Sequence, residues 1–204
     1  MLHSRKYFIF VSKLSIICYI IPTILLVSCT STKINPDTEK QVYLTDRAAV
    51  TLLPTTATEN TIQMFQSLTG NYSGKSFQMD AFLILNQDEI HVTLLNSFGT
   101  TMGTLLYTPS TLTFDSPVLP RSIKPAYIAF DFQLCFYSEE DICHELEKAG
   151  FTLKTATKDE QQLREVYEGN RLIISILKEK EKIQFVNKER NYSYIIYGDF
   201  DGIK

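Results

Sequence analysis

Short runs in which apolar and polar residues alternate occupy most of the chain after residue 50. In "KSFQMDAFLIL", every second residue from Phe77 to Leu85 is apolar, and "EIHVTLL" repeats this spacing from Ile90 to Leu94. A period of two is the signature of a β-strand with one buried face. Turn residues such as Gly169-Asn170 separate the runs, which favours hairpins. The pattern predicts about five short strands before residue 125 and about five after residue 150.

Two segments between these groups of strands have a helical pattern instead. "PAYIAFDFQLCFY", from Pro125 to Tyr137, has proline at a favourable first position and is apolar nearly all round, which predicts a largely buried helix. "SEEDICHELEKAG" begins at Ser138, a capping residue followed by acids, and ends at Gly150, a helix terminator. We therefore expect a two-helix insert over residues 125–150.

The order of strands, two helices and strands predicts a mainly β (α+β) fold with an antiparallel meander. Strands such as "AFLIL" and "LIISIL" are apolar on both faces, whereas a sheet with one solvent-exposed face requires apolar residues on the other face only. We expect a strongly curved sheet or incomplete β-barrel with the helices over its concave face. A packed core and an apolar cavity between sheet and helices both fit this pattern.

The first 28 residues have the pattern of a secretory signal. Residues 1–13 carry three basic residues and no acid, and the uncharged apolar run from Leu14 to Val27 follows. As a helix this run of 14 residues would span about 21 Å, less than the roughly 30 Å hydrocarbon core of a bilayer. An uncleaved anchor beginning at Tyr7 would have to bury Lys13, so we expect cleavage.

The sequence "LVSC", from Leu26 to Cys29, matches the bacterial lipobox at the end of this apolar run. It predicts that Cys29 is the lipidation site, thioether-linked to diacylglycerol and acylated on its new amine. Two or three acyl chains would hold the protein on a membrane. By resemblance to enterobacterial lipoproteins, Thr30 rather than Asp after the cysteine favours the periplasmic face of the outer membrane. We expect no other cofactor.

Residues 29–46 are polar and lack apolar periodicity, so we expect a lipidated flexible tether before a single domain at residues 47–204. Without residues 1–28, 17 of the 20 basic residues and all 23 acidic residues remain, a net charge of −6. An acidic chain without a basic cluster does not favour nucleic acid. We expect a monomer that attaches to a membrane through its lipid.

The search for catalytic motifs finds no nucleophile elbow, phosphate-binding loop or metal-binding spacing, so we expect neither an enzyme nor a metal site. His91 lies on a predicted strand and His144 on the second helix, and an envelope hydrolase would need one of them as its base. Cys135 and Cys143 are a possible disulfide in an oxidising compartment, or two small buried residues.

Asp131 is the acidic group in the apolar helix segment "IAFDFQL". A buried carboxylate requires partners, for which Arg164, Arg171 or backbone N–H groups are candidates. The alternatives are a partnered or solvent-facing helix residue, and a polar group that marks the mouth of a cavity.

A family resemblance adds to this interpretation. "SFGTTMGTLLY" followed by "DFQLCFY", behind a lipobox and an early "LLP" (Leu52–Pro54), resembles an uncharacterised family of Gram-negative lipoproteins with a domain of unknown function, over about residues 50–197. Those proteins look like relatives of the LolA/LolB lipoprotein-localisation fold. The resemblance implies an incomplete barrel with helices over its open face and an apolar cavity for acyl chains. Some members also resemble accessory proteins of aryl-polyene biosynthesis, which again implies a lipidic ligand.

Together these observations predict an outer-membrane-anchored periplasmic lipoprotein that binds or transfers a hydrophobic ligand, a lipid or a lipoprotein acyl chain, without catalysis. The alternative is a structural or scaffolding envelope lipoprotein with a solid core and no ligand. The residues that we expect to line the cavity are Phe82, Ile84, Leu94, Ile128, Phe132, Phe136 and Ile174.

Overall fold

The computed structural model describes residues 40–119 and 123–201 of the chain. All of them belong to the unit formed by residues 36–204. The predicted signal peptide and Cys29 lie outside the described residues. Within these two ranges, no helix combines the length and the hydrophobicity that crossing a membrane requires.

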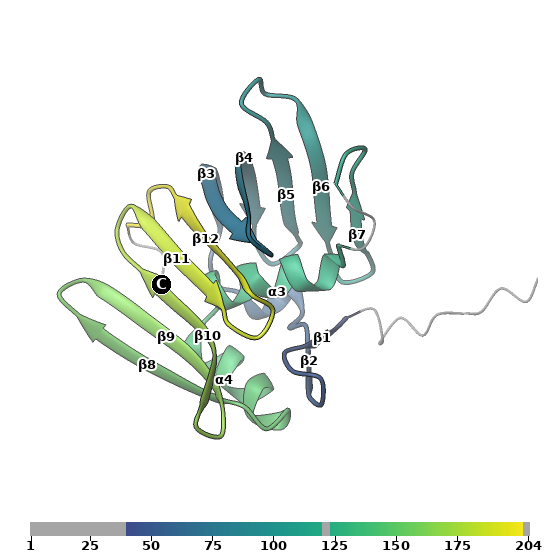
Figure 1. Ribbon diagram of the computed structural model, residues 1–204. Helices are drawn as coiled ribbons and strands as arrows, with labels where there is room; N and C mark the ends of the chain where they lie inside the picture. Colours follow the sequence, from purple (N-terminus) through teal and green to yellow (C-terminus); the bar gives the residue numbers. More distant parts are fainter. Residues whose placement is uncertain (1–39, 120–122, 202–204) are drawn as a thin grey trace, which may run out of the picture. The chain divides into compact units, whose positions relative to one another are not determined.

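Ten antiparallel strands form one sheet in the order β7-β6-β5-β4-β3-β12-β11-β10-β9-β8 (Figure 1). Strands that follow each other in the chain pair with each other, apart from β7 and β8, and β3 pairs with β12. The strands are β3 (Ile62–Tyr72), β4 (Lys75–Leu85), β5 (Ile90–Leu95), β6 (Thr101–Tyr107), β7 (Leu112–Asp115), β8 (Thr152–Lys158), β9 (Gln161–Glu168), β10 (Arg171–Lys178), β11 (Lys182–Asn187) and β12 (Tyr192–Tyr197).

The prediction of a mainly β fold with two helices is confirmed. The sheet is open, however, because β7 and β8 form its two edges, and it is neither closed nor strongly curled. The expected strong curvature was inferred from strands that are apolar on both faces. Such strands do not require curvature when part of their second apolar face is exposed to solvent, as it is here.

The two helices lie within the predicted insert. α3 (Pro125–Phe136) begins with proline in its first turn, and its side chains are buried along most of its length. α4 (Glu139–Lys148) is capped by Ser138, whose Oγ accepts a hydrogen bond from the Asp141 N–H at 3.2 Å. Gly150 follows with a φ of +84°, a conformation that favours glycine. α3 contacts β1, β6 and β7, and α4 contacts β2 and β8.

A short hairpin, β1 (Gln41–Tyr43) and β2 (Ala49–Thr51), and the 3-10 turn η1 (Thr55–Ala57) precede the sheet. Val42 and Leu44 are buried, so the ordered fold begins inside the segment that was predicted to be a tether ending at residue 46. The sequence missed this hairpin because two three-residue strands are too short to show a period. The segment that follows is fixed to α3, since the Gln133 side chain accepts a hydrogen bond from Leu53 N–H (3.1 Å) and donates one to Leu53 O (2.7 Å).

Candidate functional site

The strand register separates the ten-stranded sheet into two faces. Arg164 on β9 and Tyr192 on β12 hydrogen-bond to α3. We call the face of the sheet that carries these two side chains the helix-side face. It also carries the side chains of the residues that are in register with them on the other strands. On β4 this face carries Phe77, Met79, Ala81, Leu83 and Leu85. The alternating residues form the outer face, which lies on the opposite side of the sheet.

Five of the seven predicted lining residues lie on the helix side of the sheet or on α3. Leu94 and Ile174 belong to the helix-side face of β5 and β10, and both are buried. On α3, Phe132 and Phe136 are buried and stacked, with ring centroids 6.1 Å apart, whereas Ile128 is half-buried. These residues contribute to a packed core.

The other two predicted lining residues, Phe82 and Ile84, lie on the outer face. Each pairs with a polar residue of β5, Phe82 with Thr93 and Ile84 with His91. Because neighbouring side chains of a strand point to opposite faces, Phe82 and Ile84 cannot line one site with Leu94. The sequence did not separate these two residues from the other five because the apolar run "AFLIL" conceals which half of the strand faces the helices.

Burial along the helix-side face decreases from one end of β4 to the other. Leu83 has no exposed area, Met79 and Phe77 are half-buried, and Tyr72 at the end of the adjoining strand β3 is 61% exposed. Half-buried Phe114 on β7 and Ile128 on α3 also pack against the core cluster. Apolar surface therefore continues from the core towards solvent on the helix side of the sheet.

Asp131 of α3 lies beside this apolar surface and is held by tyrosines. The Tyr192 hydroxyl lies 2.9 Å from each Asp131 carboxylate oxygen, and Asn187 Nδ2 donates to the Tyr192 oxygen at 3.3 Å. Burial raises the pKa of Asp131 to about 7, although hydrogen bonds from Tyr192 and Tyr194 and the charge of Arg190 lower it. Burial therefore favours the protonated form of this carboxyl group.

The partners suggested for Asp131 from the sequence are occupied elsewhere. Arg164 donates to the carbonyls of Leu134 and Tyr137 at the end of α3, each at 2.9 Å. Arg171 pairs with Glu168 at 2.6 Å and with Glu189. The tyrosines of β12 were not expected as partners, since no local pattern indicates which strand lies under Asp131.

Aromatic rings of three strands lie beside Asp131 and continue the apolar surface. Phe185 of β11 stacks on Tyr194 and Tyr192 of β12, with ring centroids 4.8 and 5.9 Å apart. Tyr72 of β3 lies 6.5 Å from Tyr192 at an inclined angle. The rings place broad apolar surfaces next to one titratable carboxyl group.

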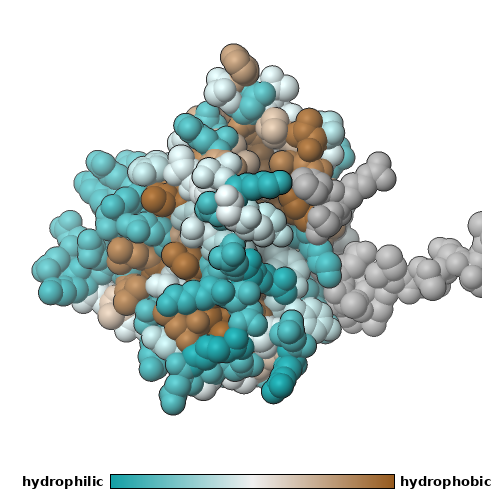
Figure 2. Space-filling model, in the orientation of Figure 1, coloured by the Kyte–Doolittle hydropathy of each residue, from teal (hydrophilic) through white to brown (hydrophobic). Residues whose placement is uncertain are grey.

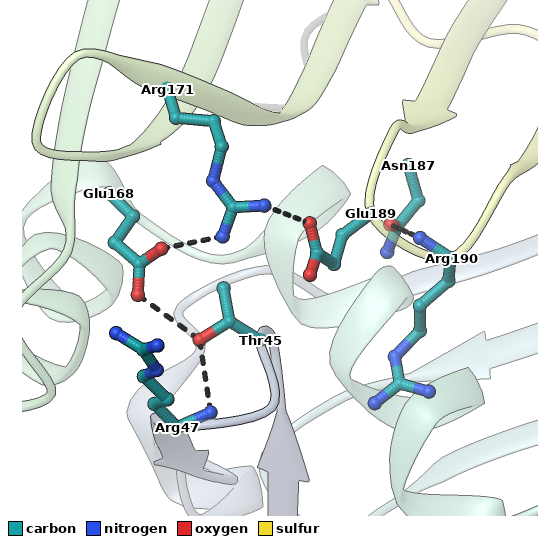
Figure 3. Close-up of polar contacts among 7 residues, drawn as sticks. All are labelled: Thr45, Arg47, Glu168, Arg171, Asn187, Glu189 and Arg190. Carbon is teal, nitrogen blue, oxygen red and sulfur yellow. Dashed lines mark hydrogen bonds and ion pairs between the residues drawn. The ribbon is translucent and has the colours of Figure 1, made fainter.

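Polar contacts tie the N-terminal hairpin to the turns of the second half of the sheet (Figure 3). Thr45 Oγ1 donates to Glu168 at 3.1 Å, and the backbone N–H of Arg47 donates to Thr45 Oγ1 at 3.4 Å. The Arg190 guanidinium donates to Tyr43 O at 2.6 Å and to the Tyr127 hydroxyl at 2.8 Å. The hairpin is thus held over α3 by contacts near both ends of its loop.

The cysteines and histidines do not gather into a reactive site. Cys135 and Cys143 are both free thiols, so the possible disulfide is not formed: Cys135 is buried, whereas Cys143 lies 3.4 Å from Glu147 at the surface of α4. His91 lies on the outer face of β5 and His144 is exposed on α4. Among the described residues, no three His, Cys, Asp or Glu side chains are placed to hold a metal ion.

Hydrophobic residues reach the surface at separate points. Figure 2 shows several separate hydrophobic patches. Phe98, in the turn between β5 and β6, is 91% exposed. Two of the hollows in the described part of the chain lie away from α3 and α4. The larger one, of about 650 Å³, crosses β4, β3, β12 and β11.

Comparison with known proteins finds one family. Its model matches residues 63–197, and its description is "Protein of unknown function (DUF3261)". The matched range contains both helices and nearly all of the ten-stranded sheet, whereas the β1–β2 hairpin precedes it. A search of curated proteins found no match to the chain.

Proposed function

Because the chain belongs to the DUF3261 family of unknown function, its role must be argued from its own residues, and we propose that it holds or passes a hydrophobic ligand with acyl chains. In this proposal the protein is anchored by lipid on Cys29 at the periplasmic face of the outer membrane and catalyses no reaction. The lipobox sequence supports the location, and the likeness of the sequence to LolA/LolB relatives supports the class of ligand.

The observation that carries the proposal is the decrease in burial along the helix-side face. A sheet face that packs only against its own helices is expected to be dry along its whole length. Here the face stays apolar from Leu83 through Met79 to Phe77 while its exposure rises. An acyl chain lying on the exposed part would extend the existing core.

The energies are sufficient for such a ligand. Burying one methylene group contributes about 0.8 kcal/mol, so ten methylenes contribute about 8 kcal/mol before the costs of ordering the chain. Asp131 and Tyr192 lie beside the apolar surface and would contact the polar head. A carboxyl group with a pKa of about 7 can donate or accept a hydrogen bond there.

Photocrosslinking in cells tests this proposal with the complete chain. Cells that express the protein are fed palmitate carrying a diazirine on its acyl chain, and crosslinked peptides are mapped by mass spectrometry. We expect crosslinks on the half-buried residues of the helix-side face, such as Met79 and Phe77. Crosslinks confined to the N-terminal residues that follow Cys29 would contradict the proposal.

Two adjacent substitutions on β4 provide a matched comparison. Met79→Glu places a charge on the helix-side face, whereas Gln78→Glu places the same charge on the exposed outer face. We expect the first substitution to reduce crosslinking at Phe77 several-fold and the second to leave it unchanged. Equal crosslinking in both variants would count against a ligand on the helix-side face.

A scaffolding role without a ligand is the second candidate, and a specific observation favours it. α3 is buried along most of its length, and its Phe132 and Phe136 side chains stack on each other in the core. A solid core of this kind would leave the surface as the functional part. If no residue of the helix-side face is crosslinked to the diazirine-palmitate, the result supports this second candidate.

A further inference from the structure

The larger hollow is a groove on the outer face, the side of the sheet away from α3. One of its walls is the row Gln78, Thr69, Ile195 and Gln184, which pair across β4, β3, β12 and β11. All four belong to the outer face, because they alternate with residues whose side chains point to the helix side. The side chains of this wall therefore differ from those of the apolar surface proposed above for an acyl ligand, although Phe77 belongs to the lining of the hollow as well.

The second wall and the floor follow from the same register. Ser76, Asn71, Ser193 and Val186 form the parallel row two positions away. Between the two walls runs the row that contains Gly70 and Tyr194, whose Cβ directions point to the helix side, so that its backbone forms the floor. Four strands spaced by about 4.8 Å give the groove a length of about 14 Å across the sheet.

The walls of the groove are mainly polar, whereas the row between them contributes Phe77, Phe185 and Tyr194. Six of the eight wall side chains are amides or hydroxyls, and none of the 12 lining residues is charged, although charged residues make up 21% of the chain. Amide and hydroxyl groups both donate and accept hydrogen bonds. Ile195 and Val186 place apolar surface among them. The groove thus offers mixed hydrogen bonding without any preference for an ion.

Aromatic side chains lie on the same face beside the groove. Tyr197 follows Ile195 by two positions on β12 and is 44% exposed, and Phe65 on β3 is 58% exposed. The residues in register with Tyr197 on the neighbouring strands include Lys182, its direct partner on β11, and Asp80, through Ser67, so this row carries one charge of each sign. Flat rings that remain exposed next to a polar groove provide apolar platforms for a ligand with alternating polar and apolar surfaces.

We propose that this outer-face groove binds an uncharged oligosaccharide chain, with N-acetylated sugars as the best-fitting class. Sugar hydroxyl and acetamido groups pair with the amides and hydroxyls of the walls, and the C–H faces of the rings pack on Ile195 and Tyr197. A nucleic acid would require cations that the groove lacks. A peptide strand gains its backbone hydrogen bonds at a sheet edge, not on a face. The inference is independent of the proposed lipid ligand.

Calorimetric titration of the complete chain tests this inference. The protein is purified in a polyoxyethylene detergent, because a sugar-headed detergent would compete, and is titrated with the tetramer of β-1,4-linked N-acetylglucosamine. The matched probe is the deacetylated tetramer, which has the same backbone but carries positive charges. We expect binding of the neutral tetramer and at least about tenfold weaker binding of the charged one, a difference of about 1.4 kcal/mol.

Two variants locate the binding site. Ser193→Phe fills the groove, and Thr113→Phe makes a similar change on the outer face of the edge strand β7, away from the groove. We expect the first variant to lose at least about tenfold in affinity for the neutral tetramer and the second to retain it. Gln184→Glu is a smaller change that adds a charge to the wall, so it tests the groove even if Ser193→Phe impairs folding.

Three outcomes of the sugar titrations would overturn the inference. They are no binding of the neutral tetramer, equal binding of both tetramers, and full affinity in Ser193→Phe and Gln184→Glu. Binding of an uncharged Ala-Ser hexapeptide in place of the sugar would also overturn it and would identify a peptide groove. Thermal unfolding followed by circular dichroism shows whether each variant is folded when it is titrated.

Discussion

The two faces of the sheet differ in what their apolar residues contact. On the helix side Leu83 is completely buried and pairs with Val92 and Met64. On the outer side Phe65 is 58% exposed, although it pairs with Phe82. Apolar residues on one face therefore form the core, whereas those on the other are available to solvent or to a ligand. Hydrophobicity alone does not distinguish a core residue from a binding residue.

The largest expected effect comes from the core side of this comparison. Leu83→Ala removes a fully buried side chain and leaves a cavity, so we expect the free energy of unfolding to fall by about 3 kcal/mol. Phe82→Ala, one position away on the outer face, removes a larger but half-buried side chain and should cost less. Urea-induced unfolding of both variants provides the measurement. A larger loss in Phe82→Ala would reverse the assignment of the faces.

The next effect concerns the centre of the sheet, where Gly70 lies on the helix side. A Cβ at this position would lie 2.5 Å from Phe77 Cζ, 2.6 Å from Ser193 O and 2.8 Å from Tyr194 Cβ. Because one of these neighbours is backbone, moving the Phe77 ring alone cannot relieve the overlap. We expect Gly70→Ala to lower the free energy of unfolding by about 2 kcal/mol.

A double substitution tests the origin of that cost. Combining Gly70→Ala with Phe77→Leu relieves the ring contact but leaves the contact with Ser193 O. We expect only part of the stability to return relative to Phe77→Leu alone. Complete recovery would mean that the backbone of β12 can shift and that the sheet is less rigid at the floor of the groove than the register indicates.

The sequence predicted the positions of the helices and strands better than it predicted which side of the sheet each strand residue faces. The mainly β class, the helices after Pro125 and Ser138 and the end at Gly150 follow from strong local signals, namely caps, prolines and period. The open form of the sheet and the hairpin before residue 52 depend on contacts between distant segments, for which the chain carries no local signal. Caps, prolines and hydrophobic periods define where a helix or strand lies in the sequence, but they do not indicate which other segments it contacts.

The candidate site shows the same limit. The lining residues predicted on α3, β5 and β10 lie on the helix side, although α3 is apolar nearly all round and "LIISIL" is apolar on both faces. Phe82 and Ile84 lie on the outer face, which the sequence did not show because their strand is apolar at every position from 81 to 85. The tyrosines that hold Asp131 could not be inferred, since they are 61 and 63 residues away along the chain.

The third effect is a dependence on pH at the boundary between core and solvent. The pKa of Asp131 is raised from 3.8 to about 7 by burial in the folded protein. A raised pKa means that the folded state binds the proton more tightly, so its contribution to stability is present at acidic pH and is lost as pH rises from about 4 to about 7. We expect Asp131→Asn to abolish this loss, because an amide does not titrate. Urea unfolding of the unmodified protein and of Asp131→Asn between pH 4 and pH 8 provides the measurement. If the free energy of unfolding changes with pH in the same way in both proteins, Asp131 is accessible to water instead.

The smallest expected effect is the sharpest test of the outer face. If Phe65 contacts only water and the edge of Phe82, Phe65→Ser should change the free energy of unfolding by less than about 0.5 kcal/mol. A loss above about 1 kcal/mol in the purified protein would mean that Phe65 already packs against something, and the two faces would then both be core. An unchanged stability would instead leave its aromatic ring free for an external partner, because an exposed ring that stabilises nothing in the isolated protein gains contacts only on binding.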